Sequence, residues 1–154
     1  MRFFTFDPVT GSGAEILAAR IEDSGGYNDW SLSPDGKYLA SGKFGLKGVP
    51  EIRIFSIADG SKRTIAVPHS AEIVGVDWAA DGKRMRVSVV KSNASGFGGY
   101  GAQAILSVDL TGKIIDNLEN DAVWFDCAIP SPDGRRVALL GGHVNSNVWL
   151  LQNF

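Results

Sequence analysis

A turn of Asp-Gly followed by a basic residue occurs three times in this chain, and this repeat constrains the fold more than any other feature. The three copies are Asp35-Gly36-Lys37, Asp81-Gly82-Lys83 and Asp133-Gly134-Arg135. In the first and third copies the preceding residues are Ser-Pro. Proline sets φ at the second turn position, and glycine accepts the positive φ that a β-carbon resists. Each copy therefore predicts a tight hairpin between two strands.

A second pattern, two apolar residues, Ser or Thr, another apolar residue and a turn ending in glycine, repeats out of phase with the first. Its copies are FFTFDPVTG (3–11), IFSIADG (54–60) and ILSVDLTG (105–112), with a weaker one in VWLLQNF (148–154). The first three begin 51 residues apart, and the fourth begins 43 residues after the third. Short β-rich runs with turn signals and no strong helical period predict an all-β protein. Four strands repeating at this interval are typical of the blades of a β-propeller.

We expect each blade to contain four antiparallel strands in chain order. The first strands are YNDWSL, IVGVDW and VWFDCAI, and the second strands are KYLASGK, RMRVSVV and RRVALLG. The second pattern supplies the third strands, and AEILAAR, KRTIAV and KIIDNL supply the fourth. The predicted division is the third and fourth strands of a shared blade in 2–22, blades in 23–67 and 68–119, and the first three strands of the shared blade in 120–154. One third strand is in surplus, and the sequence gives no account of it.

The turns resemble those of a known family. Trp-x-x-Asp-Gly-Lys in WAADGK and Ser-Pro-Asp-Gly-[Lys/Arg] in the other two copies are similar to TolB-like (WD-repeat-like) β-propeller repeats. The resemblance covers residues 27–154 and reaches the amino-terminal hairpin more weakly. It implies a propeller in which strands from both termini complete one blade, and it implies a sensory or scaffolding portion of a larger bacterial protein.

About three blades per chain are too few for a closed ring, because propellers typically contain about four to eight. An open array would also expose apolar sheet faces of more than about a few hundred Å², which soluble monomers rarely do. We therefore expect two copies to close a six-bladed ring as a homodimer. The alternative is that this chain is the tail of a longer propeller.

One aspartate recurs in the first strand of each blade. Asp29, Asp77 and Asp126 immediately precede Trp30, Trp78 and Cys127. The first strand of a propeller blade lines the central channel, and hard cations prefer several oxygen ligands. A ring of these carboxylates is therefore a candidate site for a cation or a basic peptide. The alternative, which we favour, is that each aspartate hydrogen-bonds a loop backbone and fixes the junction between blades.

Other candidate motifs indicate structure rather than chemistry. GFGGYG (96–101) matches Gly-x-Gly-x-x-Gly, but a dinucleotide site needs a helix after the glycines, and here a strand follows. His69 and His143 are far apart in the sequence and no serine elbow is present, so we expect neither a metal site nor a catalytic triad. The four tryptophans, Trp30, Trp78, Trp124 and Trp149, are expected to pack between blades.

Composition excludes several classes of function. Fifteen basic residues balance seventeen acidic ones for a formal charge of −2, which argues against a nucleic-acid-binding footprint. No apolar run approaches the length of a membrane span, and the amino-terminal segment lacks the pattern of a signal peptide. Cys127 is the only cysteine, so the chain cannot form an internal disulfide, and cysteine usage does not indicate an oxidising or a reducing compartment.

We therefore expect a non-catalytic scaffold or interaction module that binds a second copy of itself, with a further protein partner possible and no cofactor. The alternative is a ligand- or cation-binding channel, or the gating propeller of a larger hydrolase-type enzyme.

Overall fold

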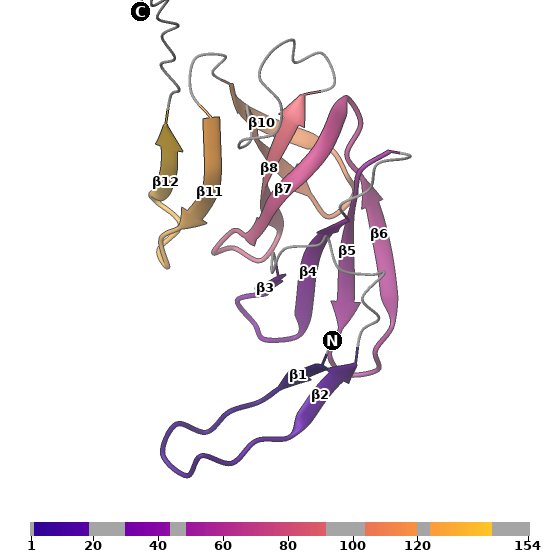
Figure 1. Cartoon of the computed structure of the whole chain (residues 1–154), viewed down its shortest axis with the longest axis vertical. Helices are drawn as coiled ribbons and strands as arrows, with labels where there is room; N and C mark the ends of the chain where they lie inside the picture. The colour runs from indigo at the N-terminus through magenta and orange to yellow at the C-terminus, as the bar shows by residue number, and fades with distance from the viewer. Residues whose placement is uncertain (1, 19–29, 44–48, 92–103, 120–123, 143–154) are drawn as a thin grey trace, which may run out of the picture.

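The computed structural model describes residues 2–18, 30–43, 49–91, 104–119 and 124–142. These segments contain twelve strands and no helix, and all sheet pairings among them are antiparallel (Figure 1). The prediction of an all-β protein is confirmed. Within the same segments we find no helix long and apolar enough to cross a membrane.

Two complete four-stranded sheets form the centre of the molecule. The first contains β3 (Trp30–Leu32), β4 (Tyr38–Lys43), β5 (Glu51–Ser56) and β6 (Lys62–Ala66) in that order. The second contains β7 (Ser70–Trp78), β8 (Arg84–Lys91), β9 (Ala104–Asp109) and β10 (Ile114–Glu119), also as an antiparallel meander. Neighbours in sequence are thus neighbours in each sheet, as expected for propeller blades.

Two hairpins flank the complete sheets. The amino-terminal hairpin pairs β1 (Arg2–Phe4) with β2 (Glu15–Ala18), and the carboxyl-terminal hairpin pairs β11 (Trp124–Pro130) with β12 (Val137–Gly142). The strand expected in VWLLQNF (148–154) lies outside the described residues. Two of the predicted blade boundaries, 22/23 and 119/120, also fall on or beside residues that the structure does not describe. The division into blades therefore stays a prediction.

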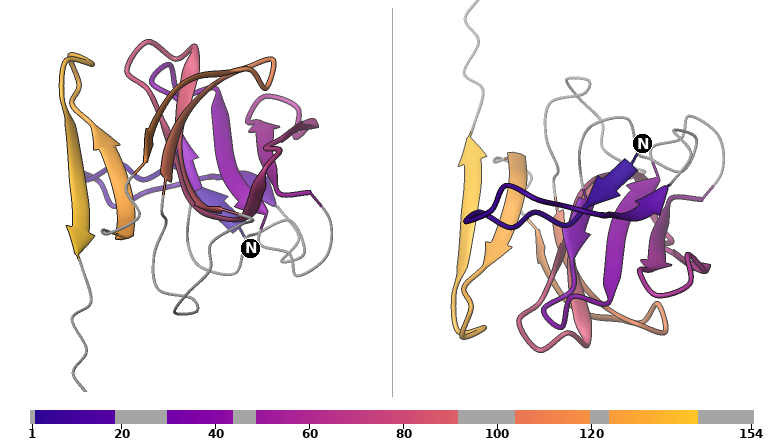
Figure 2. Two further views of the ribbon diagram at one scale, coloured as in Figure 1. Left: turned by 90° about the horizontal axis from the view of Figure 1, so that it is seen from above. Right: turned by 90° about the horizontal axis from the view of Figure 1, so that it is seen from below.

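The main core lies between the two complete sheets, which Figure 2 shows side by side with the carboxyl-terminal hairpin beyond β7–β10. Successive side chains of a strand point to opposite faces, so alternate residues of strands such as β5 and β8 enter this core. Its buried members are Ala40, Ile52, Ile54, Ile65, Val67, Ile73, Val76, Trp78, Met85, Val87, Val89, Ala104, Leu106 and Val108. Smaller clusters join each flanking hairpin to its neighbouring sheet.

Close approach between the two complete sheets depends on a glycine and a tryptophan. A β-carbon on Gly42 of β4 would lie 2.5 Å from the Ile73 side chain on β7, so only glycine lets the strands pack this closely. Trp78 donates from its backbone N–H to the Ser31 hydroxyl at 3.1 Å and from Nε1 to the Ser31 carbonyl at 3.1 Å. These contacts fix β7 against β3.

The prediction that tryptophans pack between blades is confirmed for Trp78 and for Trp30, whose ring lies 4.7 Å from that of Phe3 in the amino-terminal hairpin. The Trp124 ring lies over its cross-strand partner Gly142, and whether it also packs between blades stays a prediction. Trp149 lies outside the described residues.

Candidate functional site

The repeated turns are held by their own side chains. In the first copy, Gly36 has φ of 71° and donates to the Ser33 carbonyl at 2.9 Å. The buried Ser33 hydroxyl accepts from the backbone N–H groups of Lys37 at 3.1 Å and Tyr38 at 2.9 Å, and donates to Asp35 at 2.7 Å. Because the Ser33 hydroxyl and the Lys37 N–H both donate to it, the Asp35 carboxylate has a lowered pKa. The turn motif is therefore explained by structure alone.

The other two turns keep the geometry and change the contacts. In the third copy the Ser131 hydroxyl donates to Asp133 at 2.6 Å and accepts from the backbone N–H of Arg136 at 3.0 Å. In the middle copy Ala79 replaces the serine, and the Arg84 guanidinium instead donates to Asp81 at 2.8 and 3.0 Å. The side chains that distinguish the turn motif are thus used to close hairpins.

Two of these turns border a cleft of about 320 Å³ between β7–β8 and the carboxyl-terminal hairpin. It is lined by Ala79, Ala80, Asp81, Arg84, Arg86, Pro130, Pro132, Asp133, Gly134 and Val137. Arg84 is paired with Asp81, so the cleft presents both charges together. The carboxylates of Asp81 and Asp133 in its walls accept hydrogen bonds within their own turns.

A second cleft, of about 280 Å³, lies beside the connection between β6 and β7. His69 lines it in the left-handed backbone region, with φ of 63°, a conformation in which His is enriched among residues other than glycine. Lys91 and Glu119 pair across it at 3.0 Å. His143 lies outside the described residues, so the expected separation of the two histidines is untested.

Of the three channel aspartates, only the Asp77 side chain is described. Asp77 follows Val76 and precedes Trp78, both of which enter the main core, so its carboxylate lies on the opposite face of β7. Partial burial raises the pKa of this carboxyl group. Asp77 faces Arg86 in the register of β7 and β8.

The ring of carboxylates stays a prediction, because the side chains of the other two aspartates are not described. Asp29 and the GFGGYG loop lie outside the described residues. Asp126 occupies the point in β11 where the register with β12 shifts, between Phe125 and Cys127. Among the described residues no three His, Cys, Asp or Glu side chains are grouped so that they would hold a metal ion.

Apolar side chains are exposed on the outward face of β3–β6, which we call the N-side face. Leu39 and Phe55 are buried there under Phe3 of the amino-terminal hairpin. Leu32, the cross-strand partner of Leu39, points to the same face but is 54% exposed. The hairpin thus covers part of the N-side face and leaves the side chain of Leu32 on β3 open.

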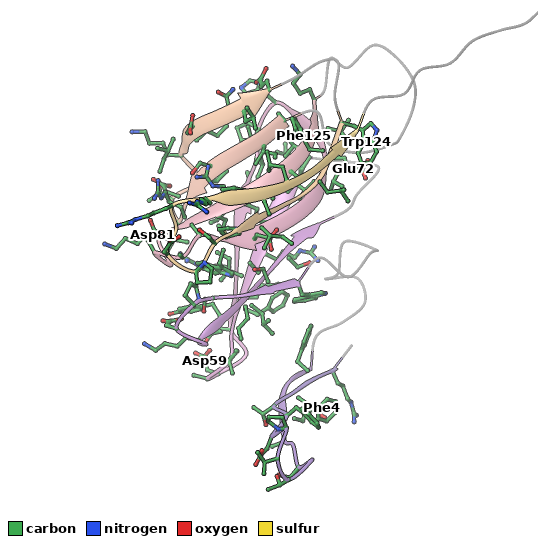
Figure 3. All side chains as sticks on the ribbon, turned by 90° about the vertical axis from the view of Figure 1, so that its left-hand side faces the viewer. Phe4, Asp59, Glu72, Asp81, Trp124 and Phe125 are labelled. Carbon is green, nitrogen blue, oxygen red and sulfur yellow. The ribbon has the colours of Figure 1, made fainter. Side chains whose placement is uncertain are left out.

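The carboxyl-terminal hairpin has a similar open surface, which we call the C-side face. Ala128 and Phe125 point inward and are buried against Ile105 of the β7–β10 sheet. Ile129 and Leu140 point outward and are 55% and 53% exposed. Figure 3 shows Phe4 on the amino-terminal hairpin and Trp124 and Phe125 on the carboxyl-terminal one, at opposite ends of the molecule.

The strand edges differ in charge. The outer strands of the complete sheets carry charges, Lys62 and Arg63 on β6 and Asp116 and Glu119 on β10. Such charges discourage pairing with a further strand. The sequence of β12, VALLGG, carries neither a charge nor a proline, and among the described residues β12 pairs only with β11. The described residues of β12 therefore provide neither of these two protections against strand addition.

Sequence reasoning anticipated exposed apolar faces but named none of their residues. β11 and β12 carry apolar residues on both faces, as in Ala128 beside Ile129 and Leu139 beside Leu140. Apolar residues on both faces predict a hairpin that is covered on both sides, and this signal alone would have identified Ile129 and Leu140.

Comparison with known proteins identifies the architecture. No family model matches the sequence, and no curated protein matches it. Among solved structures, TolB from Acinetobacter baumannii aligns with a TM-score of 0.64 and 21% identity, over 94% of this chain and 33% of that one. A putative TolB from Agrobacterium tumefaciens aligns with a TM-score of 0.56 and 20% identity, over 74% of this chain and 38% of that one.

A peptidase is also similar in fold. An acylaminoacyl peptidase from Pyrococcus horikoshii aligns with a TM-score of 0.53 and 15% identity, over 94% of this chain and 28% of that one. At such identities the likeness concerns the fold alone. The described strands therefore have the β-propeller fold, and the resemblance to TolB-like propellers is confirmed at that level. This chain spans about a third of the length of these structures.

Proposed function

We propose that this protein is a non-catalytic β-propeller interaction module whose first partner is a second copy of itself. The observation that carries the proposal is the pair of open apolar surfaces, represented by Leu32 on the N-side face and by Ile129 and Leu140 on the C-side face. Both lie where a propeller blade normally has a neighbour.

The shape of the described sheets supports self-association. A blade contains four strands, whereas each flanking hairpin shows two within the described residues. The two hairpins correspond to different halves of a blade, since β1–β2 come from the third and fourth strands of the repeat and β11–β12 from the first and second. The two described hairpins of two copies therefore supply complementary halves of a blade.

The proposed closure also explains why apolar side chains are exposed on both open faces of the single chain. Contiguous apolar patches larger than about 300–600 Å² are uncommon on soluble monomers and mark interaction sites. A second copy covers both open faces at once and leaves no blade without a neighbour. The broad loop face of the completed ring then becomes the surface for any further protein partner.

Mass in solution tests this proposal. Sedimentation velocity and light scattering over a concentration series are expected to show a species of twice the 16.4 kDa chain mass. A single monomeric species up to the highest soluble concentration would contradict the proposal, because the open faces would then be stable in water.

A further inference from the structure

We infer that the carboxyl-terminal hairpin β11–β12 of one copy completes a blade with the amino-terminal hairpin β1–β2 of a second copy. In this composite blade the strand order is β11, β12, β1 and β2, with the last two from the partner. The inference rests on the proposed self-association and specifies which surfaces meet.

The packing of the complete sheets shows what belongs on the N-side face. β7, the first strand of its sheet, contacts β3 and β4, the first and second strands of the sheet before it. In the same way β11 contacts mainly β7 and β8, and to a smaller extent β9. First strands thus pack on first and second strands of the preceding sheet, throughout the described array. The open place beside β3 therefore fits the first and second strands of a preceding blade.

The amino-terminal hairpin of the same chain already covers the part of the N-side face around Trp30, Leu39 and Phe55. Phe3 packs on Trp30, which in turn lies 5.3 Å from Phe55 on β5. The hairpin corresponds to the third and fourth strands of a blade, and the side chain left uncovered is Leu32 on β3. The missing occupant is a first-and-second-strand hairpin, and β11–β12 is the hairpin of this chain that has that identity.

The faces are matched in chemistry on both sides of the composite blade. Ile129 and Leu140 on the C-side face would lie against Leu32 of the other copy, so three half-exposed aliphatic side chains are covered together. On the opposite side, Phe4 of β1, which follows Phe3 in the strand, is 58% exposed. It would meet Leu118 of β10, which shares a face with the buried Ile105 and is 47% exposed.

The edges of the two hairpins are also suited to pairing. The outer edge of β12 has no charged or proline residue to block a further strand. Pairing β12 with β1 of the other copy satisfies the backbone groups of both edges, as strand addition does in other assemblies. A twofold axis repeats the contact, so the ring contains two complete sheets from each copy and two composite blades.

Cross-linking between two differently tagged chains tests the inference. In a Cys127→Ser background, one chain carries Leu32→Cys and the other carries Ile129→Cys. Mixed and treated with a short bis-maleimide that spans the distance between packed sheets, about 10 Å, they are expected to give a covalent product containing both tags. The matched control replaces Leu32→Cys by Val49→Cys, another exposed apolar position, which precedes the end of β5 farthest from Leu39 and its partner Leu32.

The outcomes separate the inference from the proposed function. Preferential cross-linking of the Leu32→Cys and Ile129→Cys pair over the control supports the composite blade. A dimer by mass without that preference overturns the composite blade and leaves self-association intact. A monomer by mass overturns both the composite blade and the proposed self-association.

Discussion

Replacing Leu32 by alanine is expected to weaken the dimer while leaving the fold intact. Fully burying a leucine side chain contributes about 1.5–3 kcal/mol, and Leu32 has 54% of its surface left to bury. A twofold dimer contains the contact twice, and alanine keeps only the β-carbon. The loss of association free energy is therefore about 1–2.5 kcal/mol, which raises Kd about 5- to 70-fold.

Sedimentation velocity over a dilution series measures this change, with denaturation by urea as the test of folding. The matched control is Val49→Ala, because Val49 is 58% exposed and precedes the end of β5 farthest from Leu39 and its partner Leu32. We expect the control to keep the Kd of the unmodified protein. Equal Kd values for Leu32→Ala and the unmodified protein would refute the reasoning, as would a loss of folding free energy large enough to explain the dissociation.

Three further changes test the packing and the electrostatics. Gly42→Ala places a methyl group against Ile73 and is expected to lower the free energy of unfolding by about 1–3 kcal/mol, measured by urea denaturation; an unchanged midpoint would contradict the close approach. Ser33→Ala removes the acceptor of two backbone N–H groups in a buried turn and should cost about 1–3 kcal/mol, whereas Ser131→Ala, in a more exposed turn, should cost less; the reverse order would contradict the burial argument. Burial raises the pKa of Asp77 in the folded state, so ionisation opposes folding above that pKa. Asp77→Asn should therefore stabilise the protein at pH 7, and this gain should fall as pH decreases through the folded pKa and vanish below the unfolded pKa; a gain that does not depend on pH would exclude this cause.

The hairpin turns were predictable because their interactions are local. Four or five neighbouring residues contain the proline, the glycine with positive φ and the side chain that caps the turn, as in Ser33 to Lys37. The period of the repeat then predicted antiparallel four-stranded meanders, which β3–β6 and β7–β10 show. The middle copy shows the limit of this reasoning, since the role of Arg84 in replacing the missing serine depends on its side-chain conformation.

The candidate site was less predictable because burial is a non-local property. The sequence placed Asp77 beside Trp78. It did not show that Trp78 enters the core while Asp77 lies half-buried with a raised pKa. Likewise, nothing adjacent to Leu32 distinguishes it from Leu39, its buried cross-strand partner. Their difference arises because the amino-terminal hairpin covers one and not the other.

The sequence by itself determined the all-β class, the repeating meander and the turns, because turn chemistry and alternation of side chains act over a few residues. Only the tertiary structure decided which faces are covered. The contact of Gly42 with Ile73 and the exposure of Leu32, Ile129 and Leu140 depend on how whole sheets stack. Stacking joins residues far apart in the chain, and the free energy of burying their apolar surface depends on the neighbour that each sheet meets.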